Sequence, residues 1–193
     1  MAEDKKNARR TGATICFIDQ TGISEIPNVR RTWAPRGQTP ILKHQGRWNH
    51  VSVMGAITIS PRRRHVNLYL SYYPRRAVNQ HDVVQFLQGL MRHTFKPIIV
   101  IADRGNIHRS SIVKQFIKKV GRISMEHFPS YAPELNPMEG VWSNLKAAKL
   151  ANFCPETLPD LLSGIEGAAT ATQKDRALIR GFIRGAGLPI RLP

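Results

Sequence analysis

Three carboxylates in this chain follow short stretches of apolar or rigid sequence that would hold them in place. Asp19 and Asp103 each come directly after an apolar, strand-like run, and Glu139 comes just after the rigid dipeptide Asn136-Pro137. Asn is a preferred N-cap and Pro a preferred first helical residue, so Glu139 should lie in the first turn of a helix. Carboxylate oxygens are typical ligands of Mg²⁺. The pattern therefore predicts a divalent-metal site formed by Asp19, Asp103 and Glu139.

Such a site has a recognisable chemistry. Two metal ions roughly 4 Å apart can activate water and stabilise the leaving oxygen during cleavage of a phosphodiester. Each carboxylate also has a structural alternative. Asp19 and Asp103 both precede turn-forming residues and could be turn residues themselves. Glu139 could support the helix N-terminus and its dipole without binding metal.

The elements that must position these residues follow from the apolar patterns. Alternating or continuously apolar runs predict strands, and apolar residues recurring at helical spacing predict helices. The expected strands are 13–18, 50–60, 65–73, 97–102 and 123–128, and the expected helices are 79–91, 110–120, 137–150, 156–169 and 173–184. Three meandering strands followed by alternating helices and strands predict an α/β fold. We expect an RNase H-like mixed sheet with helices on both faces and extra C-terminal helices.

The domain organisation follows from the same reading. We expect a flexible basic lead-in at 1–12, a catalytic domain at 13–150 with a basic loop insertion at 26–47, and a C-terminal helical extension at 151–193. No apolar run approaches the roughly 18 residues of a membrane span, which predicts a cytoplasmic protein. Cys16 and Cys154 lie far apart in apolar sequence, so we expect two buried free thiols.

The charge distribution predicts a polyanionic partner. The net charge is +16, and no acid occurs between Glu25 and Asp82, a stretch that carries ten basic residues. A second acid-free stretch, between Asp103 and Glu126, carries six more. A solvated basic face or contact with an anionic membrane would be alternatives. Nucleic acid is favoured because the charge lies on predicted loops and strand ends rather than on one amphipathic helix.

Several blocks of sequence point to a family. The chain resembles the catalytic domain of DDE transposases of the mariner superfamily, in the branch found in bacterial insertion sequences. The spacing between Asp103 and Glu139, with 35 residues between them, suits that family. The blocks that carry the resemblance are FIDQTG at 17–22, RTWAPRGQTP at 31–40, VIAD at 100–103 with HRS at 108–110, and YAPELNPMEGVW at 131–142.

The resemblance implies an enzyme, a metal-dependent DNA transposase. It implies an RNase H-like fold in which Asp19, Asp103 and Glu139 bind Mg²⁺, with Mn²⁺ as a substitute and two ions in the site. It implies nicking of DNA at transposon ends and attack of the freed 3′-hydroxyl on target DNA. The partners would be transposon-end and target DNA, with the protein acting as a homodimer on DNA in the nucleoid.

Further residues are candidates for supporting roles. We expect His108, Asn136 and Pro137 to support the metal site, although His108 could instead bond locally at a helix start. Trp33 either anchors the basic loop or packs beneath it, whereas Trp142 is expected in the core. Lys146 could approach a phosphate or be solvated. The candidate DNA-binding residues are Arg30, Arg31, Arg36, Lys43, Arg47, Arg104, Arg109 and Lys146.

Two departures from the family pattern leave alternatives open. Gln20 stands where this branch often has Glu, and Arg104 stands where it usually has Asn. The chain could therefore be a catalytically weakened relative that binds DNA or a protein partner, or an RNase H-like nuclease of another kind. The twelve residues before the first strand cannot supply a helix-turn-helix domain. We therefore expect a separate one, with this chain binding DNA mainly through phosphates.

Overall fold

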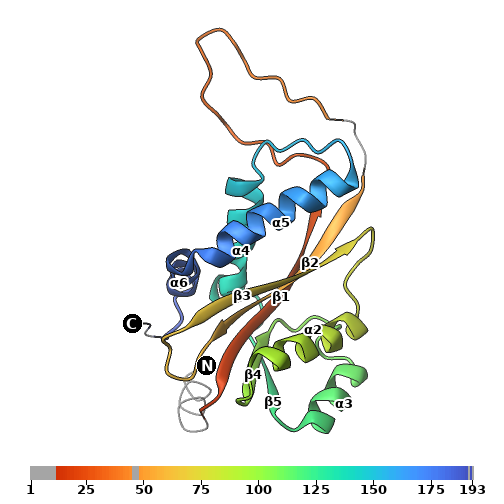
Figure 1. Cartoon of the computed structure of the whole chain (residues 1–193), viewed down its shortest axis with the longest axis vertical. Coiled ribbons are helices and arrows are strands. Elements are labelled where there is room, and N and C mark those ends of the chain that lie inside the picture. Colours follow the sequence, from red (N-terminus) through yellow and green to blue (C-terminus); the bar gives the residue numbers. More distant parts are fainter. Residues whose placement is uncertain (1–11, 45–47, 191, 193) are drawn as a thin grey trace.

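A computed structural model describes residues 12–44, 48–190 and 192 (Figure 1). Its elements begin with two long strands and a third that returns beside the second, and helices then alternate with two short strands. In chain order they are β1 (Thr14–Ser24), β2 (His50–Ile59), β3 (Val66–Pro74), α2 (Gln80–His93), β4 (Ile98–Ala102), α3 (Ser111–Val120), β5 (Ile123–His127), the 3-10 turn η1 (Pro133–Leu135), α4 (Pro137–Asn144), the π-helical turn η2 (Leu145–Lys149), α5 (Leu158–Lys174) and α6 (Arg176–Gly185).

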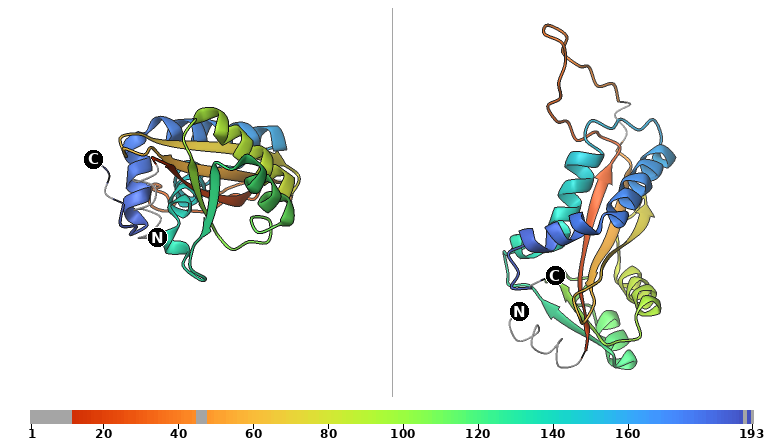
Figure 2. Two further views of the ribbon diagram at one scale, coloured as in Figure 1. Left: turned by 90° about the horizontal axis from the view of Figure 1, so that it is seen from below. Right: turned by 60° about the vertical axis from the view of Figure 1, so that its left-hand side comes forward.

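The five strands form one mixed sheet in the order β3-β2-β1-β4-β5. β2 is antiparallel to both β1 and β3, whereas β4 is parallel to β1 and to β5. Helices α4, α5 and α6 cover one face of the sheet, and α2 and α3 cover the other (Figures 1 and 2). This confirms the predicted α/β order. It includes the three-strand meander, the helices on both faces and the extra C-terminal helices.

The side chains of β1 alternate between the two faces of the sheet. Phe17 lies in the core that α4, α5 and α6 cover, whereas Ile18 lies in the core beneath α2 and α3. Because successive side chains of a strand point to opposite faces, Asp19 belongs to the α4 face and Gln20 to the opposite one. A single strand thus contributes polar side chains on both faces at the same level.

The position of Asp19 differs from the prediction. It was expected at the end of a strand, but β1 continues for five more residues to Ser24 because pairing with β2 extends to Ser24↔His50. On its other side, pairing with β4 stops at Phe17↔Ile101. Asp19 therefore lies inside a strand, at the level where one neighbouring strand has ended and the sheet is open.

Side-chain caps close the starts of the helices, including the Asn136 cap that the sequence predicted. Asn79 forms a capping box with Asp82 at the start of α2, and the Ser110 and Asn136 side chains cap α3 and α4. Both C-terminal helices exist, but α5 runs on to Lys174, beyond the predicted residue 169. α6 starts at Arg176, where the Asp175 side chain accepts a hydrogen bond from the backbone of Leu178.

The basic loop projects from one end of the molecule without regular structure (Figures 1 and 2). Its described part, residues 26–44, is almost entirely exposed, and Trp33 is 100% exposed. Of the two alternatives for Trp33, packing beneath the loop is therefore wrong. At its base the loop is fixed by Asn152, whose side chain bonds both the backbone N–H and the carbonyl of Arg30 at 2.8 and 3.0 Å.

The structure shows the state of the two cysteines and whether its described helices could span a membrane. Both cysteines are free, but only Cys16 is buried, while Cys154 is partly exposed. Burial raises the pKa of the Cys16 thiol to about 12. Within residues 12–44, 48–190 and 192, no helix combines the length and the apolar character that crossing a membrane requires.

Gly55 allows α4 to approach the sheet, and this predicts a destabilising substitution. Gly55 pairs with Asp19, and a Cβ at this position would lie 2.8 Å from Cη2 of Trp142 and 2.5 Å from Cε of Met138. We expect Gly55→Ala to lower the free energy of unfolding by about 1–3 kcal/mol, because the rigid indole ring must move. Urea denaturation would measure this change.

Gly22→Ala is the matched control. Gly22 lies in the neighbouring strand β1, and a Cβ there would meet no atom within 4 Å. We expect this variant to be as stable as the parent or slightly more stable, since alanine loses less backbone entropy on folding than glycine. Equal stability of the two variants would contradict the proposed close approach.

Candidate active site

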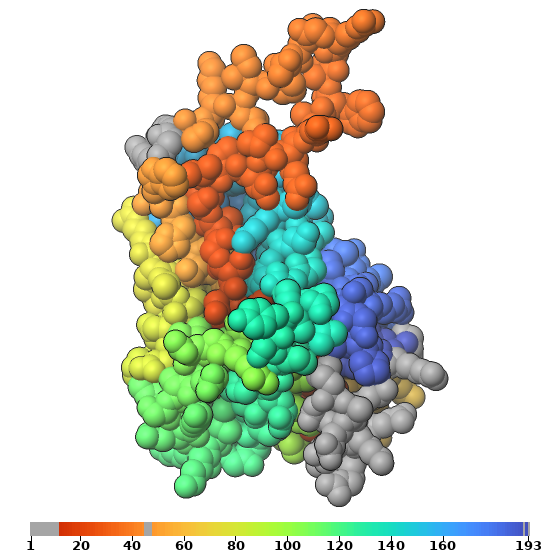
Figure 3. Space-filling view, turned by 180° about the vertical axis from the view of Figure 1, so that it is seen from behind, coloured from red at the N-terminus to blue at the C-terminus, as the bar shows by residue number. Residues whose placement is uncertain are grey.

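Asp19, Asp103 and Glu139 line one cavity of about 410 Å³. They come from β1, from the loop after β4 and from the first turn of α4, and residues 128–133 form another wall. In Figure 3 the red surface of β1 lies beside the blue-green segment that leads to α4. Three carboxylates far apart in sequence therefore face the same space, although it is open to solvent.

Asp19 is the buried member of the set. Its residue is 8% exposed, and its Oδ2 accepts hydrogen bonds from Nδ2 of Asn136 and Nε1 of Trp142, both at 3.0 Å. Its Oδ1 accepts the backbone N–H of Gln20 at 2.8 Å. Burial raises the pKa of Asp19 to about 6, the bonds from Trp142 and Gln20 oppose this, and the charges of Glu139 and Asp103 add to it. A cation in the cavity would favour the ionised carboxylate.

Asp103 stands beside Asp19 because of strand register. β1 and β4 pair in parallel up to Phe17↔Ile101, and two more residues along each chain lead to Asp19 and Asp103. The Asp103 side chain is 49% exposed, and its Oδ1 accepts the backbone N–H of Gly105 at 3.0 Å. Its backbone carbonyl lies 2.8 Å from Nδ1 of His127. The turn predicted as an alternative is present, yet the carboxylate still lines the cavity.

Glu139 is the third residue of α4 and is exposed. The Asn136 side chain accepts the backbone N–H of Met138, as predicted for an N-cap. The backbone N–H of Asn136 donates to the carbonyl of Pro133, whereas in a capping box it would donate to the Glu139 carboxylate. The carboxylate of Glu139 is thus not used to close the helix start, and it lines the cavity instead.

The donor set fits a hard divalent cation, because it consists of three carboxylates around one space. Among the residues that the structure describes, no three Asp, Glu, His or Cys side chains already stand close enough to hold one ion. Asp103 and Glu139 are both solvent-accessible, so their side chains can rotate toward the buried Asp19. Binding would thus close a ligand set that the backbone has already brought together.

The supporting residues divide into predicted and unpredicted ones. The Asn136 side chain caps α4 and also donates a hydrogen bond to Asp19, so it links α4 to β1. Pro137 is the first residue of the helix. His108 is 1% exposed, and burial lowers its pKa. Trp142 was predicted only as core, and its bond to Asp19 was missed. The only feature of the sequence that indicated a role for Trp142 in the site is its position three residues after Glu139 on the same helix. This spacing does not identify Asp19 as its hydrogen-bond partner.

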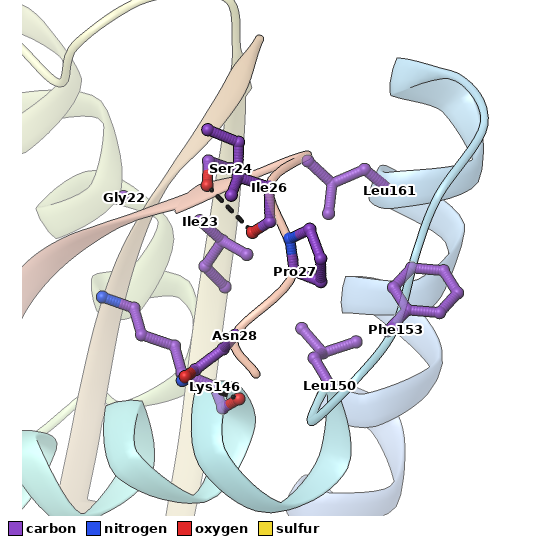
Figure 4. Close-up of a pocket in the computed structure, with 10 residues that line it drawn as sticks. All are labelled: Gly22, Ile23, Ser24, Ile26, Pro27, Asn28, Lys146, Leu150, Phe153 and Leu161. Atoms are coloured by element: carbon purple, nitrogen blue, oxygen red, sulfur yellow. Dashed lines mark hydrogen bonds between the residues drawn. The ribbon is translucent and has the colours of Figure 1, made fainter. Parts of the chain in front are cut away.

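Two of the candidate DNA-binding residues are held by the protein itself. Nε of Arg104 donates to the carbonyl of Phe128 at 3.2 Å, which directs this exposed side chain along the cavity wall. Nζ of Lys146 donates to Oγ1 of Thr21 at 2.5 Å, so this lysine is not simply solvated. Lys146 also lines a second cavity, of about 230 Å³, at the base of the basic loop (Figure 4).

Figure 4 shows how the base of the loop meets η2, the turn that follows α4. Asn28 points toward this turn, and its Nδ2 donates to the carbonyl of Lys146 at 3.2 Å. The remaining basic candidates are exposed, on the loop or in the segment just before α3, except Arg47, which lies outside the described residues. The exposed ones are Arg30, Arg31, Arg36, Lys43 and Arg109.

Comparisons with known proteins identify the family and the fold of this chain. Residues 14–161 match the family described as DDE superfamily endonuclease. Among proteins with curated descriptions, none matches the chain in sequence. Among solved structures, the Mos1 transposase paired-end complex with left transposon end is similar, with a TM-score of 0.66 at 16% identity over 96% of this chain and 55% of that chain.

Two further structures share the fold. The Mos1 mariner paired-end complex with Mn has a TM-score of 0.65 at 16% identity, covering 96% of this chain and 56% of that chain. The catalytic domain of Mos1 mariner transposase has a TM-score of 0.58 at 15% identity, covering 96% and 82%. The chain thus spans a little over half the length of the Mos1 chains in the two complexes. Since the family match covers most of the sequence, the chain belongs to the DDE superfamily endonucleases and has the RNase H-like fold of a transposase catalytic domain.

Proposed function

We propose that this protein cleaves DNA strands at transposon ends and joins the freed 3′-hydroxyl to target DNA, using divalent metal ions. The observation that carries the proposal is the convergence of Asp19, Asp103 and Glu139 on one cavity. Family membership and the likeness to Mos1 transposase complexes support it. The proposed location is the cytoplasm, at the nucleoid.

The three carboxylates would bind two Mg²⁺ ions, with Mn²⁺ as a substitute. Bound there, such ions supply an activated water or 3′-hydroxyl and stabilise the leaving oxygen of the phosphodiester. Asp19 is fixed by Asn136 and Trp142 and provides the rigid side of the site. Asp103 and Glu139 provide accessible oxygens that can adjust as a phosphate enters. Arg104, which lines the cavity, would contact the DNA backbone.

The proposed partner is duplex DNA, held mainly through its phosphates. The exposed arginines of the basic loop and the net charge of +16 support this. Similar structures include Mos1 transposase with a left transposon end and the Mos1 strand transfer complex, which supports action on transposon-end and target DNA. We further propose that the protein acts as a homodimer on DNA, with a separate helix-turn-helix domain or protein reading the ends.

Removing one ligand should abolish cleavage. We expect Asp103→Asn to reduce nicking of a transposon-end duplex in Mg²⁺ or Mn²⁺ by about 10³-fold or more, since metal-borne charge stabilisation contributes several kcal/mol. Ser130→Ala, which alters the same cavity without removing a carboxylate, should cleave nearly as the parent does. Undiminished cleavage by Asp103→Asn would refute the site. Preference for RNA or an RNA–DNA hybrid would instead indicate a different nuclease.

The buried carboxylate predicts a pH dependence of stability. Asp19 has a pKa of about 6 when folded and about 4 when unfolded, so between these values the folded protein retains a proton that the unfolded chain loses. Without metal, the free energy of unfolding should therefore fall by up to about 3 kcal/mol as the pH rises from 4 to 6 and beyond. Mg²⁺ should reverse this fall, because it binds the ionised form.

Urea denaturation at several pH values would measure this effect. Asp19→Asn is the control, because it removes the titrating group and should flatten this part of the pH profile. If the parent and Asp19→Asn lose stability in parallel from pH 4 to 7, the pKa of Asp19 is not raised in the folded protein.

The basic loop should determine how steeply DNA binding depends on salt. We expect Arg31→Ala with Arg36→Ala to reduce the slope of log K against log salt by up to about 2, because each phosphate contact releases about one counterion. Lys118→Ala with Lys119→Ala removes the same charge from the exposed side of α3 and serves as the control. Equal slopes for the two double variants would mean that the loop makes no specific phosphate contacts.

A further inference from the structure

A buried histidine lies between the strand that carries Asp19 and the loop that carries Asp103. Nε2 of His108 is 3.1 Å from Oε1 of Gln20 and 3.4 Å from Oδ1 of Asp103. The His108 side chain is fully buried, whereas that of Asp103 is 49% exposed. A rigid ring nitrogen thus faces two oxygens that belong to two different elements of the site.

The hydrogen-bond geometry assigns the proton of His108. Nε2 faces a carboxylate oxygen and an amide oxygen, so a lone pair there would be repelled by both, and an N–H is required. Nδ1 is buried, and no hydrogen-bond partner for it exists among the described residues. A bare nitrogen is the less costly state there, because a buried N–H without an acceptor is penalised. His108 is therefore the neutral tautomer with its proton on Nε2.

The contact fixes the two aspartates relative to each other. Gln20 follows Asp19 directly, and its backbone N–H bonds Oδ1 of Asp19 at 2.8 Å, while its side chain lies on the opposite face of β1 and meets His108. Three residues before His108, the backbone N–H of Gly105 bonds Oδ1 of Asp103. Since pairing between β1 and β4 ends at Phe17↔Ile101, no backbone bond of that ladder holds the chains together at the level of the aspartates.

We propose that His108 and Gln20 form a side-chain clasp that replaces the missing strand pairing and holds the Asp103 carboxylate beside the cavity that Asp19 also lines. His108 is then a positioning residue that acts through Asp103 and does not touch the substrate. The glutamine at position 20 suits this role, because its amide oxygen accepts the Nε2 proton without placing a second carboxylate beside this nitrogen. The clasp deepens the proposed function, since the metal site it serves is part of that proposal.

The test compares two substitutions of the same histidine. His108→Gln can place a donor near the position of Nε2, whereas His108→Asn is shorter and reaches only toward the position of Nδ1. Mg²⁺ affinity of the metal-free protein, measured by calorimetry, should fall about 10- to 100-fold in His108→Asn, because residues that orient metal ligands have effects of this size. His108→Gln should remain within a few-fold of the parent. Thermal unfolding of both variants identifies any general loss of folding.

A second substitution, Gln20→Leu, tests the clasp from its other side. It removes the acceptor and leaves Asp103 untouched, and its effect on Mg²⁺ affinity should not add to that of His108→Asn, because both changes break one clasp. In the metal-free parent, the ring ¹⁵N signals of His108 should show a proton on Nε2 and none on Nδ1. Additive effects of the two substitutions, or a proton on Nδ1, would overturn the clasp.

The outcomes separate the clasp from the proposed function. If the parent binds no Mg²⁺ and cleaves no DNA, the proposed function fails, yet the ¹⁵N signals of His108 still test the clasp. If the parent binds Mg²⁺ and the Gln and Asn variants at position 108 weaken binding equally, the clasp is refuted while the metal site stands.

Discussion

The buried carboxylate of Asp19 is the constraint on which the arrangement of this protein depends. A carboxylate at this depth is unstable as an ion unless donors and positive charge surround it. Two of its donors, Asn136 and Trp142, come from the start and the middle of α4. The hydrogen bonds therefore fix the helix that carries Glu139 against the strand that carries Asp19, and Gly55 makes room for the contact.

The burial of Asp19 lowers the stability of the metal-free protein at a site that the proposed chemistry needs. Burial, together with the charges of Asp103 and Glu139, raises the pKa of Asp19 and penalises the ionised state that a metal site needs. Divalent cations would offset that penalty, so metal binding and folding become linked. The exposed Arg104 adds positive potential at the cavity wall, which favours the approach of a phosphate backbone.

Much of the site could be predicted from sequence because its parts are local. Asn136-Pro137 predicts the start of α4 and the place of Glu139 in its first turn, since capping and proline preferences act within one turn. The apolar run at 97–102 predicts β4 and the position of Asp103 just after it. The supporting role assigned to His108 could be guessed from the resemblance, but its neighbours could not. The end of β1 was misplaced because strand length depends on the partner strand, not on the strand's own residues.

The sequence by itself determined the order of strands and helices, the identity of the three carboxylates and the basic character of the loop. These features depend on the conformational preferences of residues, on the spacing of apolar residues and on charge, which are properties of residues close together in the sequence. Only the tertiary structure decided that Trp142 bonds Asp19, that His108 meets Gln20 and that Asp103 lies beside Asp19 at the open edge of β1. Those contacts join residues 84 to 123 positions apart, and strand register and helix packing alone select them.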